Sequence, residues 1–539
     1  MHTQTAAEPA STSFADPQRW WVLAACCTVG FAQLAEPQLW MIGLNIPASA
    51  FGTAWGQYRL LSNLGVVLFV AFQLAGGVLG DLVGRRRILL IGAVGSTLSN
   101  MLSLLAWNLP ALIATRALVG MLGALAFPLT LALVRLMFVG PERTVALLLY
   151  TLAISIGTLA SLLAIPLENW FGWRWALLLP IIAGLTGIIL AWRYLPESRA
   201  HGGIRRVEAI ALAAWTLVLL ALMFGLAIAY SSGTLLNPIT LTAGGVGMLG
   251  LLAIVVWVQR SPRVGRTPRE DWGPRPLLSL MLLVTAILSF ALSGYVLQMY
   301  QFFYTVQQYS VFVSGLALAP IVLGNLVVLR WAARVAVEWP RHVVITGGMA
   351  AMGAAMLLTA LARPGLPYLI LVPCIALFGI GFLLASTAWT YFFFSALPAD
   401  LAGVTAGINR AAGLVGGTLA GVVLSTVVQF SGMADFQRRL DDIQLTPQQQ
   451  EQALDTLNEV LQLGHAIDDT TQTPEVLVSL ALLTAYRESR SAGISSAMVV
   501  AGALCLACSI VTWLRLSHAA RAAPQQVLEE RAADESAME

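Results

Sequence analysis

The sequence predicts an all-α integral membrane protein with fourteen membrane-spanning helices. Of its 539 residues, 58% are hydrophobic and only 11% are charged, whereas soluble domains carry about a quarter charged residues. The mean hydropathy is +0.78, and apolar runs of about 20 residues, the length that crosses a bilayer, recur along the chain. These observations make the lipid bilayer the solvent in which the chain folds.

The fourteen predicted spans follow one another through mostly short connections. The middle pair, the seventh and eighth, is short of polar residues and proline, as expected of plain lipid-exposed helices. In chain order the spans cover residues 20–43, 57–79, 88–107, 111–134, 145–167, 174–193, 207–230, 238–258, 276–298, 312–333, 342–361, 366–392, 403–430 and 491–515.

The distribution of arginine predicts the orientation of these helices. Short cytoplasmic loops retain positive charge, and alternate loops hold seventeen arginines against three in the opposite set. The arginine-rich set includes residues 85–87, the pair Arg135 and Arg143, and the stretch from Arg260 to Arg275. We therefore expect a multi-pass protein of the bacterial inner membrane with both termini in the cytoplasm.

One connection on the outer side is long. Residues 431–490 hold ten acidic residues and four arginines. Thr446-Pro447 and Gly464 are suitable ends for an amphipathic helix, and Thr473-Pro474-Glu475 is a suitable start for a second one. Two interpretations stay open: an ordered lid packed on the helices, or a docking surface for a periplasmic partner.

Composition excludes several kinds of chemistry. The sequence has 30 arginines and no lysine. It therefore has neither the lysine of a nucleotide-binding P-loop nor a lysine that could form a Schiff base. The five cysteines lie in apolar runs and the five histidines form no ligand spacing. We expect no metal site, no catalytic residues and no enzyme activity, and we do not expect nucleic acid as a partner.

The connection after the second span reads Gly77-Val-Leu79-Gly80-Asp81-Leu-Val-Gly84-Arg85-Arg86-Arg87. Its glycines permit a tight turn, and Asp81 can cap the next helix and pair with an arginine across the loop. Such a clasp would hold two helices together in one state and release them in another. The run resembles the signature loop of the major facilitator superfamily, although Leu82 replaces a usually basic residue. We therefore expect a conformational latch made of Gly77, Asp81, Gly84, Arg85 and Arg86.

The fourth span contains Arg116-Ala-Leu-Val-Gly120-Met-Leu-Gly123-Ala124. This run resembles the second motif of the same superfamily, with Val119 in place of the usual glutamine. An arginine inside a span is costly unless it is paired or functional, and the neighbouring glycines admit another helix backbone. The alternative is that Arg116 extends toward the outer interface, where its charge would be hydrated.

Further runs resemble the fourteen-helix drug:proton antiporter branch of this superfamily. They are Trp173-Arg174-Trp175, Asn409-Arg410 with Gly413, Gly416 and Gly417, and Tyr309-Ser310 before Gly315-Leu316-Ala317. The resemblance implies two six-helix bundles related by a pseudo-two-fold axis, with two extra central helices and alternating access. The expected division is a tail at 1–19, a bundle at 20–193, linker helices at 194–275, a bundle at 276–516 and a tail at 517–539.

Two departures from the branch affect its coupling residues. The stretch Gly157-Thr-Leu-Ala-Ser161-Leu162-Leu-Ala164 lacks the second glycine and the proline that the branch usually carries in its fifth span. In the first span, Gln38 stands nine residues before Pro47, where the branch typically has an aspartate. The nearest carboxylate is Glu36.

Glu36 is the predicted proton-coupling carboxylate. It is the acidic residue that lies well inside a span, at a depth comparable to that of Arg116. An apolar setting favours the protonated carboxyl and a nearby arginine favours the ionised one, so switching this pairing would couple proton movement to transport. Pro37 is expected to break the helix at Glu36. The alternative is a carboxylate that faces the outer vestibule and stays ionised.

The expected substrate cavity is formed by polar or aromatic residues inside apolar spans, because cavities for amphiphiles are mostly apolar with a few polar groups. For Tyr300 and Tyr304 the alternative is an interfacial aromatic belt. With Arg116 and Arg410 nearby, neutral, weakly acidic or monocationic substrates are favoured. The candidates are Gln38, Trp40, Asn45, Gln298, Tyr300, Tyr304, Trp389, Tyr391, Asn409 and Arg410.

The favoured function is proton-coupled export of small amphiphilic compounds, such as drugs or toxic metabolites. The expected partners are this substrate, protons and the lipid bilayer, with a periplasmic adaptor protein as a further candidate. No cofactor is expected, because the proton gradient supplies the energy. Two alternatives stay open: a dedicated metabolite carrier or importer with different coupling, and a membrane sensor or assembly protein that does not transport.

Overall fold

The regular secondary structure of the computed structural model is exclusively helical over the residues it describes. These are residues 18–40, 55–138, 140–160, 167, 170–198, 216–218, 220, 221, 224, 225, 242, 275–395, 402–443 and 474–538. The elements are α1 (Gln18–Gln38), α3 (Trp55–Val83), α4 (Arg85–Leu104), α5 (Leu109–Met137), α6 (Gly140–Ala160), α8 (Trp173–Ala176), α9 (Leu178–Tyr194), α12 (Arg275–Gln301), the π-helix η4 (Phe302–Val306), α13 (Val311–Leu316), α14 (Pro320–Val327), α15 (Leu329–Glu338), α16 (Arg341–Thr359), α17 (Tyr368–Ser395), α18 (Ala402–Ile443) and α20 (Pro474–Met538).

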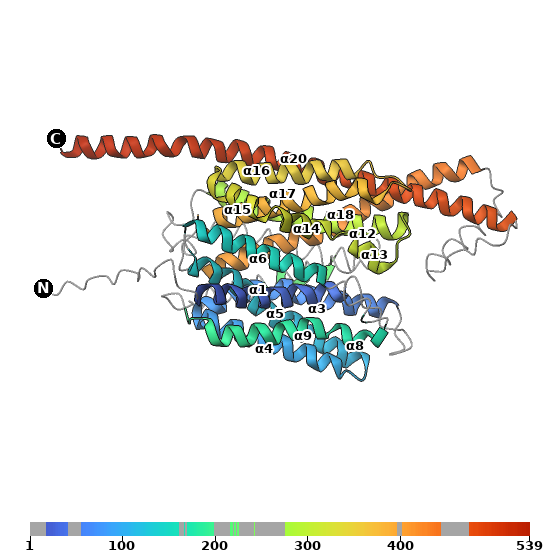
Figure 1. Ribbon diagram of the computed structural model, residues 1–539, viewed down its shortest axis with the longest axis horizontal. Coiled ribbons are helices and arrows are strands. Elements are labelled where there is room, and N and C mark those ends of the chain that lie inside the picture. Colours follow the sequence, from blue (N-terminus) through green and yellow to red (C-terminus); the bar gives the residue numbers. More distant parts are fainter. Residues whose placement is uncertain are drawn as a thin grey trace.

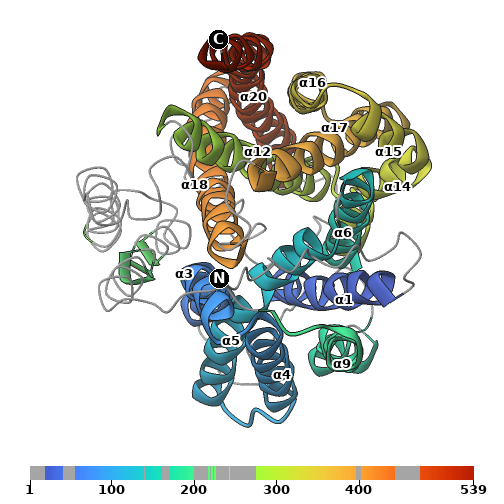
Figure 2. The ribbon, with the colours of Figure 1, turned by 90° about the vertical axis from the view of Figure 1, so that its left-hand side faces the viewer.

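The helices form two bundles, which confirms the predicted fold class (Figure 1). The first bundle holds the helices from α1 to α9, and the second holds those from α12 to α20. Viewed along the helices, α18 lies beside α3, and α6 lies beside α14 and α17 (Figure 2). Leu148 and Leu152 of α6 are buried in the core of the second bundle. Helix α6 therefore links the two bundles.

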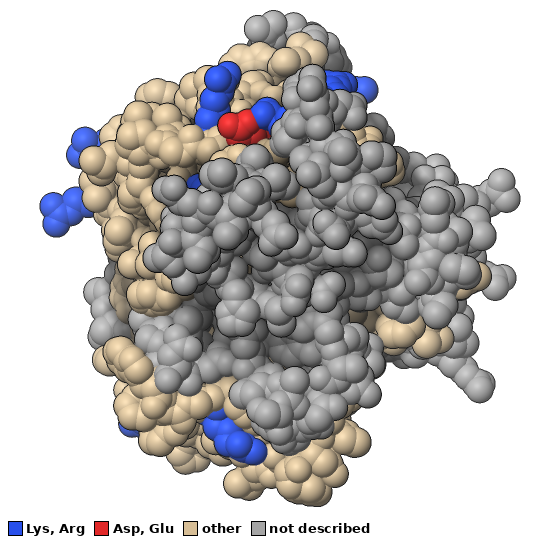
Figure 3. Space-filling model, turned by 90° about the vertical axis from the view of Figure 1, so that its right-hand side faces the viewer, with Lys and Arg blue, Asp and Glu red and all other residues tan. Residues whose placement is uncertain are grey.

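The two faces at the ends of the helix bundles differ in the chain segments and charged side chains that they carry. Helix α20 ends on the side where α1 begins (Figure 1), and we call this side the terminal face. The described surface of the opposite face is mostly uncharged, with scattered basic side chains and a small acidic patch (Figure 3). Asp435, Arg439 and Glu488 belong to helical segments that extend past the bundles on that side.

The apolar runs correspond to helices of membrane-spanning length. Nine helical stretches within the described ranges are long and apolar enough to cross a bilayer, and each coincides with a predicted span. Helices α1 and α6 occupy the described parts of two further spans. The predicted spans 207–230 and 238–258 lie almost entirely outside the described residues. Leu220, one of the few described there, packs with Val67 and Val422 where α3 and α18 meet.

The predicted span 312–333 is not one continuous helix. It is divided into α13, α14 and α15. The side chain of Ser310 caps α13 by accepting a hydrogen bond from the backbone N–H of Val313 at 3.3 Å. Helix α14 begins at Pro320, because proline cannot donate a backbone hydrogen bond and is suited to the first turn of a new helix.

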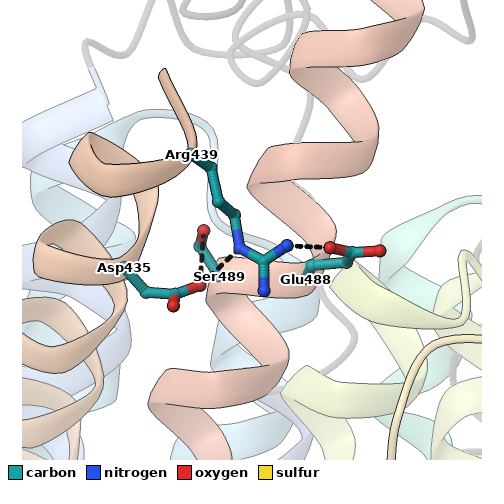
Figure 4. A network of polar contacts seen from close by, with 4 residues as sticks. All are labelled: Asp435, Arg439, Glu488 and Ser489. Carbon is teal, nitrogen blue, oxygen red and sulfur yellow. Dashed lines mark hydrogen bonds and ion pairs between the residues drawn. The ribbon is translucent and has the colours of Figure 1, made fainter. Parts of the chain in front are cut away.

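The predicted outer connection is partly helix. Helix α18 continues to Ile443, and α20 begins at Pro474, as predicted for the second outer helix, but runs without a break through the last span to Met538. Figure 4 shows how the two extensions are joined: Arg439 donates to Asp435 at 2.6 Å and pairs with Glu488. Ser489 donates to Asp435 at 3.1 Å. The amphipathic helix expected after Thr446-Pro447 lies outside the described residues.

Two local predictions are wrong. Helix α1 continues through Glu36 and Pro37 to Gln38, with π-helical turns at residues 39 and 40. The missing N–H of Pro37 is thus accommodated without a break at Glu36. Asp81 lies within the last turn of α3, and not in a loop, because Gly84 alone connects α3 to α4 with φ +125°.

Close packing of α3 on α5 depends on small residues. A Cβ atom built on Gly120 would collide with the backbone of Gly65, and one on Gly76 would lie 2.6 Å from the carbonyl oxygen of Ala124. Glycine therefore lets the two backbones approach at a distance that no larger residue allows. This contact holds the helix that carries Arg116 against α3.

We predict that Gly120→Ala lowers the thermal stability of the purified protein in detergent, because overpacking at a backbone contact costs about 1–3 kcal/mol. The matched control is Gly421→Ala on α18, where an added Cβ meets nothing within 4 Å. This control should leave the melting temperature unchanged or slightly raised. Equal melting temperatures for Gly120→Ala and the wild type would contradict the packing argument.

Candidate functional site

A buried ion pair joins α1 to α5. Arg116 Nη1 pairs with Glu36 Oε1, and the two side chains are 0% and 5% exposed. Arg116 is fully buried rather than extended to the interface, and Glu36 is buried rather than open to a vestibule. Removing one partner of such a pair costs about 3–5 kcal/mol, because the other charge is left buried and uncompensated. The predicted partners Glu36 and Arg116 are thus in contact.

Glycine makes room for the guanidinium. A Cβ atom on Gly65 would lie 2.6 Å from Arg116 Nη2, so α3 accepts the arginine only because residue 65 has no side chain. Arg116 Nε and Nη2 have no hydrogen-bond partner among the described residues. The ion pair with Glu36 is therefore the main compensation for a charge that the surrounding helices enclose.

The ring of Trp40 packs against Arg116 of this pair. Its ring centroid lies 4.5 Å from the guanidinium carbon of Arg116, within the range of a cation–π interaction. The side chain is 1% exposed. The structure therefore places Trp40, which we predicted in the substrate cavity, against the pair of Glu36 and Arg116.

Residues of the predicted latch pair with one another within the first bundle. Arg85 Nε and Nη2 each lie 2.8 Å from Asp81 Oδ1, and both side chains are buried. The pairing is as predicted, but the capping role is wrong: α4 is preceded by Gly84 and has no side-chain cap. Arg86 Nη2 donates to the carbonyl oxygen of Trp192 at 2.5 Å. Gly77 is buried in α3, one turn before Asp81.

The latch also holds the end of α9. The backbone N–H of Arg85 donates to the carbonyl oxygen of Ser198 at 2.8 Å, and Arg87 pairs with Glu197 at 3.4 Å. A Cβ atom on Gly84 would lie 2.5 Å from Glu197. Asp81 and its arginines thus fix three helix ends at the terminal face.

In the second bundle, a hydrogen-bonded chain joins three helices. Trp389 Nε1 of α17 donates to Thr285 Oγ1 of α12 at 2.9 Å, and this hydroxyl lies 2.9 Å from Asn409 Oδ1 of α18. Trp389 and Asn409 were predicted as cavity residues, and the structure brings them together. Gln298 is also buried on α12.

Tyr391 lies elsewhere than predicted. Its ring centroid is 3.8 Å from the guanidinium carbon of Arg341, on α16, and 5.6 Å from that of Arg143, on α6. Both arginines stand in the first turns of helices that begin at the terminal face. Because α6 belongs to the first bundle, Tyr391 contributes to a contact between bundles rather than to a cavity with Trp389.

The other predicted cavity residues divide into two groups. Tyr300 and Tyr304 stack with centroids 6.1 Å apart, and Tyr304 is 42% exposed, which favours the alternative of an interfacial belt. Asn45 and the side chains of Gln38 and Arg410 lie outside the described part of the chain.

Sequence reasoning missed several residues. In the sequence, Thr285 is one threonine in an apolar helix. Its bonds to Trp389 and Asn409 depend on how α17 and α18 pack against α12. Gln73 is fully buried on α3, and neither amide atom has a hydrogen-bond partner in the described ranges; a glutamine in an apolar span was the available signal. Among the described residues, no three His, Cys, Asp or Glu side chains are grouped to hold a metal ion.

We predict that Asp81→Asn impairs transport while membrane insertion stays normal, because Arg85 loses a buried charged partner. The measurement is drug efflux per quantity of protein in the membrane. Glu197→Gln is the control, since it removes only the more exposed pair with Arg87 and such pairs contribute about 0–1 kcal/mol. Full efflux by Asp81→Asn would exclude the latch.

Comparison with known proteins agrees with this architecture. Residues 29–239 match the family model described as Major Facilitator Superfamily. The chain is 24% identical over 510 residues to "Multidrug efflux pump LfrA" of Mycolicibacterium smegmatis, covering 92% of this chain and 96% of that one. It is 28% identical over 369 residues to "Uncharacterized MFS-type transporter EfpA" of Mycobacterium tuberculosis, covering 67% and 68%.

Solved structures share the fold. The human organic anion transporter MFSD10 superposes with a TM-score of 0.58 at 15% identity. The match covers 92% of this chain and 100% of that one. A bacterial homologue of the human drug peptide transporters PepT1 and PepT2 gives a TM-score of 0.56 at 14% identity, covering 93% and 99%. These structures show a shared fold, and the family match over residues 29–239, with the two bundles and the signature loop, agrees with the predicted resemblance to the major facilitator superfamily.

Proposed function

We propose that this protein is a secondary transporter that exports small amphiphilic compounds from the bacterial cytoplasm in exchange for protons. The observation that carries the proposal is the enclosed pair of Glu36 and Arg116. A proton-coupled carrier needs a group that titrates between two exposures, and a buried carboxylate beside a permanent cation is such a group.

The pair supplies a physical mechanism for coupling. While Glu36 is ionised, the pair is neutral overall and can remain buried between α1 and α5. When Glu36 binds a proton, Arg116 is left with a buried charge, which raises the free energy of the closed arrangement. Protonation therefore favours a rearrangement of the helices around the pair, and release of the proton restores it.

The names of related proteins support the export of drug-like compounds. LfrA is named a multidrug efflux pump, and a relative in Streptomyces alboniger, 26% identical over 426 residues, is named puromycin resistance protein pur8. A relative in Streptomyces glaucescens is named a tetracenomycin C resistance and export protein. Neutral, weakly acidic and monocationic amphiphiles suit a site with few membrane carboxylates and a buried arginine.

The orientation follows from the arginines. We place the terminal face, with Arg85, Arg143 and Arg341, in the cytoplasm, so that both termini are cytoplasmic in the inner membrane. The contact of Tyr391 with Arg143 and Arg341 then closes the cytoplasmic side in this state, and rocking of the two bundles would open it. The joined ends of α18 and α20 would reach the periplasm, where an adaptor protein could bind.

The proposal predicts that wild-type protein protects an efflux-deficient bacterium against amphiphilic drugs and that Glu36→Gln does not. The substitution removes the proton site and leaves Arg116 uncompensated. The measurement is a growth-inhibition panel of dyes, detergents, uncouplers, weak-acid antibiotics and monocations at matched expression, with the empty vector as reference.

Two further variants separate coupling from folding. Glu36→Asp keeps a carboxylate and should retain part of the protection. The double variant Glu36→Gln/Arg116→Gln removes both charges, so it should be at least as stable as Glu36→Gln and equally inactive. Protection that survives in Glu36→Gln would move coupling to another residue, and no protection by the wild type would favour a dedicated metabolite carrier.

A further inference from the structure

Two aromatic rings lie between two arginines in a series that starts at the buried ion pair. Arg116 lies against the ring of Trp40, and Trp40 contacts Trp173 with ring centroids 6.5 Å apart at 58°. Arg174 lies 4.6 Å from the ring of Trp173. Arg174 also donates to the carbonyl oxygens of Leu104 and Ala106, at 3.0 and 3.1 Å, which fixes the outer end of the series to the end of α4.

Within this series Trp40 has a particular position. Arg116 has two partners near the end of α1: the carboxylate of Glu36 and, one turn later, the ring face of Trp40. Both aromatic rings of the series are buried, Trp40 at 1% and Trp173 at 5% exposure. The indole N–H of Trp40 has no hydrogen-bond partner among the described residues, so the ring is held by packing and by the guanidinium.

The two partners of Arg116 differ in one respect that matters for coupling. Glu36 loses its charge when it binds a proton, whereas the electron-rich face of an indole is present at every pH. Arginine stays charged throughout. In the protonated half of the cycle, the ring is therefore the remaining described group that stabilises the buried guanidinium.

We propose that Trp40 is a positioning residue for proton coupling: its ring holds the charge of Arg116 while Glu36 is protonated, and so sets the proton affinity of Glu36. The inference rests on the proposed function of the pair. It assigns Trp40 to coupling, in place of the substrate contact that its residue type suggested.

Other titratable groups do not account for this effect among the described side chains. Those on the helices packed around the pair lie mainly at the terminal face or on the extensions of α18 and α20. The exceptions are Cys26 and Cys27 in the middle of α1 and Tyr150 of α6, whose hydroxyl is bonded to Thr130 at 2.6 Å. Arg174 of α8 is separated from the ion pair by the rings of Trp40 and Trp173. The distant groups are Arg19, Cys26 and Cys27 of α1, Asp81 of α3, Arg85, Arg86 and Arg87 of α4, Arg135 of α5, Glu142 and Arg143 of α6, Arg193 and Tyr194 of α9, and Asp435, Arg438 and Arg439 of α18.

The direction of the effect follows from the charges. Loss of the ring destabilises Arg116 more when Glu36 is neutral than when Glu36 is ionised and paired with it. The protonated state therefore becomes less favourable, and Glu36 should release its proton at lower pH. A desolvated cation–π interaction implies a downward shift of about one pH unit for Trp40→Leu and about half a unit for Trp40→Phe, which retains a weaker ring.

The test is an infrared pH titration of the purified, full-length protein, which needs no transported ligand. The band of the protonated carboxyl that is present in the wild type and absent in Glu36→Gln reports Glu36. Its midpoint is then compared among the wild type, Trp40→Phe, Trp40→Leu and the control Trp107→Leu, an exposed tryptophan at 79%. Trp40→Phe preserves most of the packing, so the test does not depend on Trp40→Leu being folded.

The expected order of midpoints is wild type equal to Trp107→Leu, then Trp40→Phe, then Trp40→Leu. An unchanged or raised midpoint in the Trp40 variants would overturn the inference and leave the role of Glu36 intact. Absence of any titrating Glu36 band in the wild type would instead overturn the proton-coupling function itself.

Discussion

The ion pair between Glu36 and Arg116 is the constraint on which the first bundle depends. Two charges enclosed in a membrane protein must be matched to each other, and the surrounding helices are shaped for that purpose. Gly65 leaves the volume that the guanidinium occupies, Gly120 lets α5 pack against α3, and Trp40, directly after α1, covers the cation. The pair is thus both a structural centre and a group whose charge state can change the fit of three helices.

Apolar side chains also contribute contacts between the bundles, beside the contact of Tyr391 with Arg143. Val67 of α3 packs with Val422 of α18, and Leu148 of α6 is buried in the second bundle. Apolar surfaces of this sort can slide and re-form without leaving unpaired charges. The described polar contacts of the signature loop join the ends of α3 and α4 to the chain after α9 through Asp81, Arg85 and Arg87. The charged groups of the signature loop therefore hold together helix ends of the first bundle at the terminal face.

Much of this arrangement could be predicted from the sequence. Apolar runs of membrane length predicted the spans, and a lone carboxylate at the depth of an arginine predicted the pair. The contacts of Trp40, Thr285 and Tyr391 could not be predicted, because each depends on how distant helices pack and rotate. The continuous α1 at Pro37, the extension of α18 to Ile443 and the unbroken course of α20 also escaped prediction, since hydropathy marks where a helix crosses the bilayer and not where it ends.

The most direct test of the account is exchange in proteoliposomes with an acidic interior, measured as uptake of the monocationic dye ethidium. The account predicts uptake by wild-type protein that stops when the pH gradient is collapsed, and no uptake by Glu36→Gln at equal reconstitution. Gradient-driven uptake of the same rate by Glu36→Gln would contradict the central claim that this carboxylate, paired with Arg116, carries the proton.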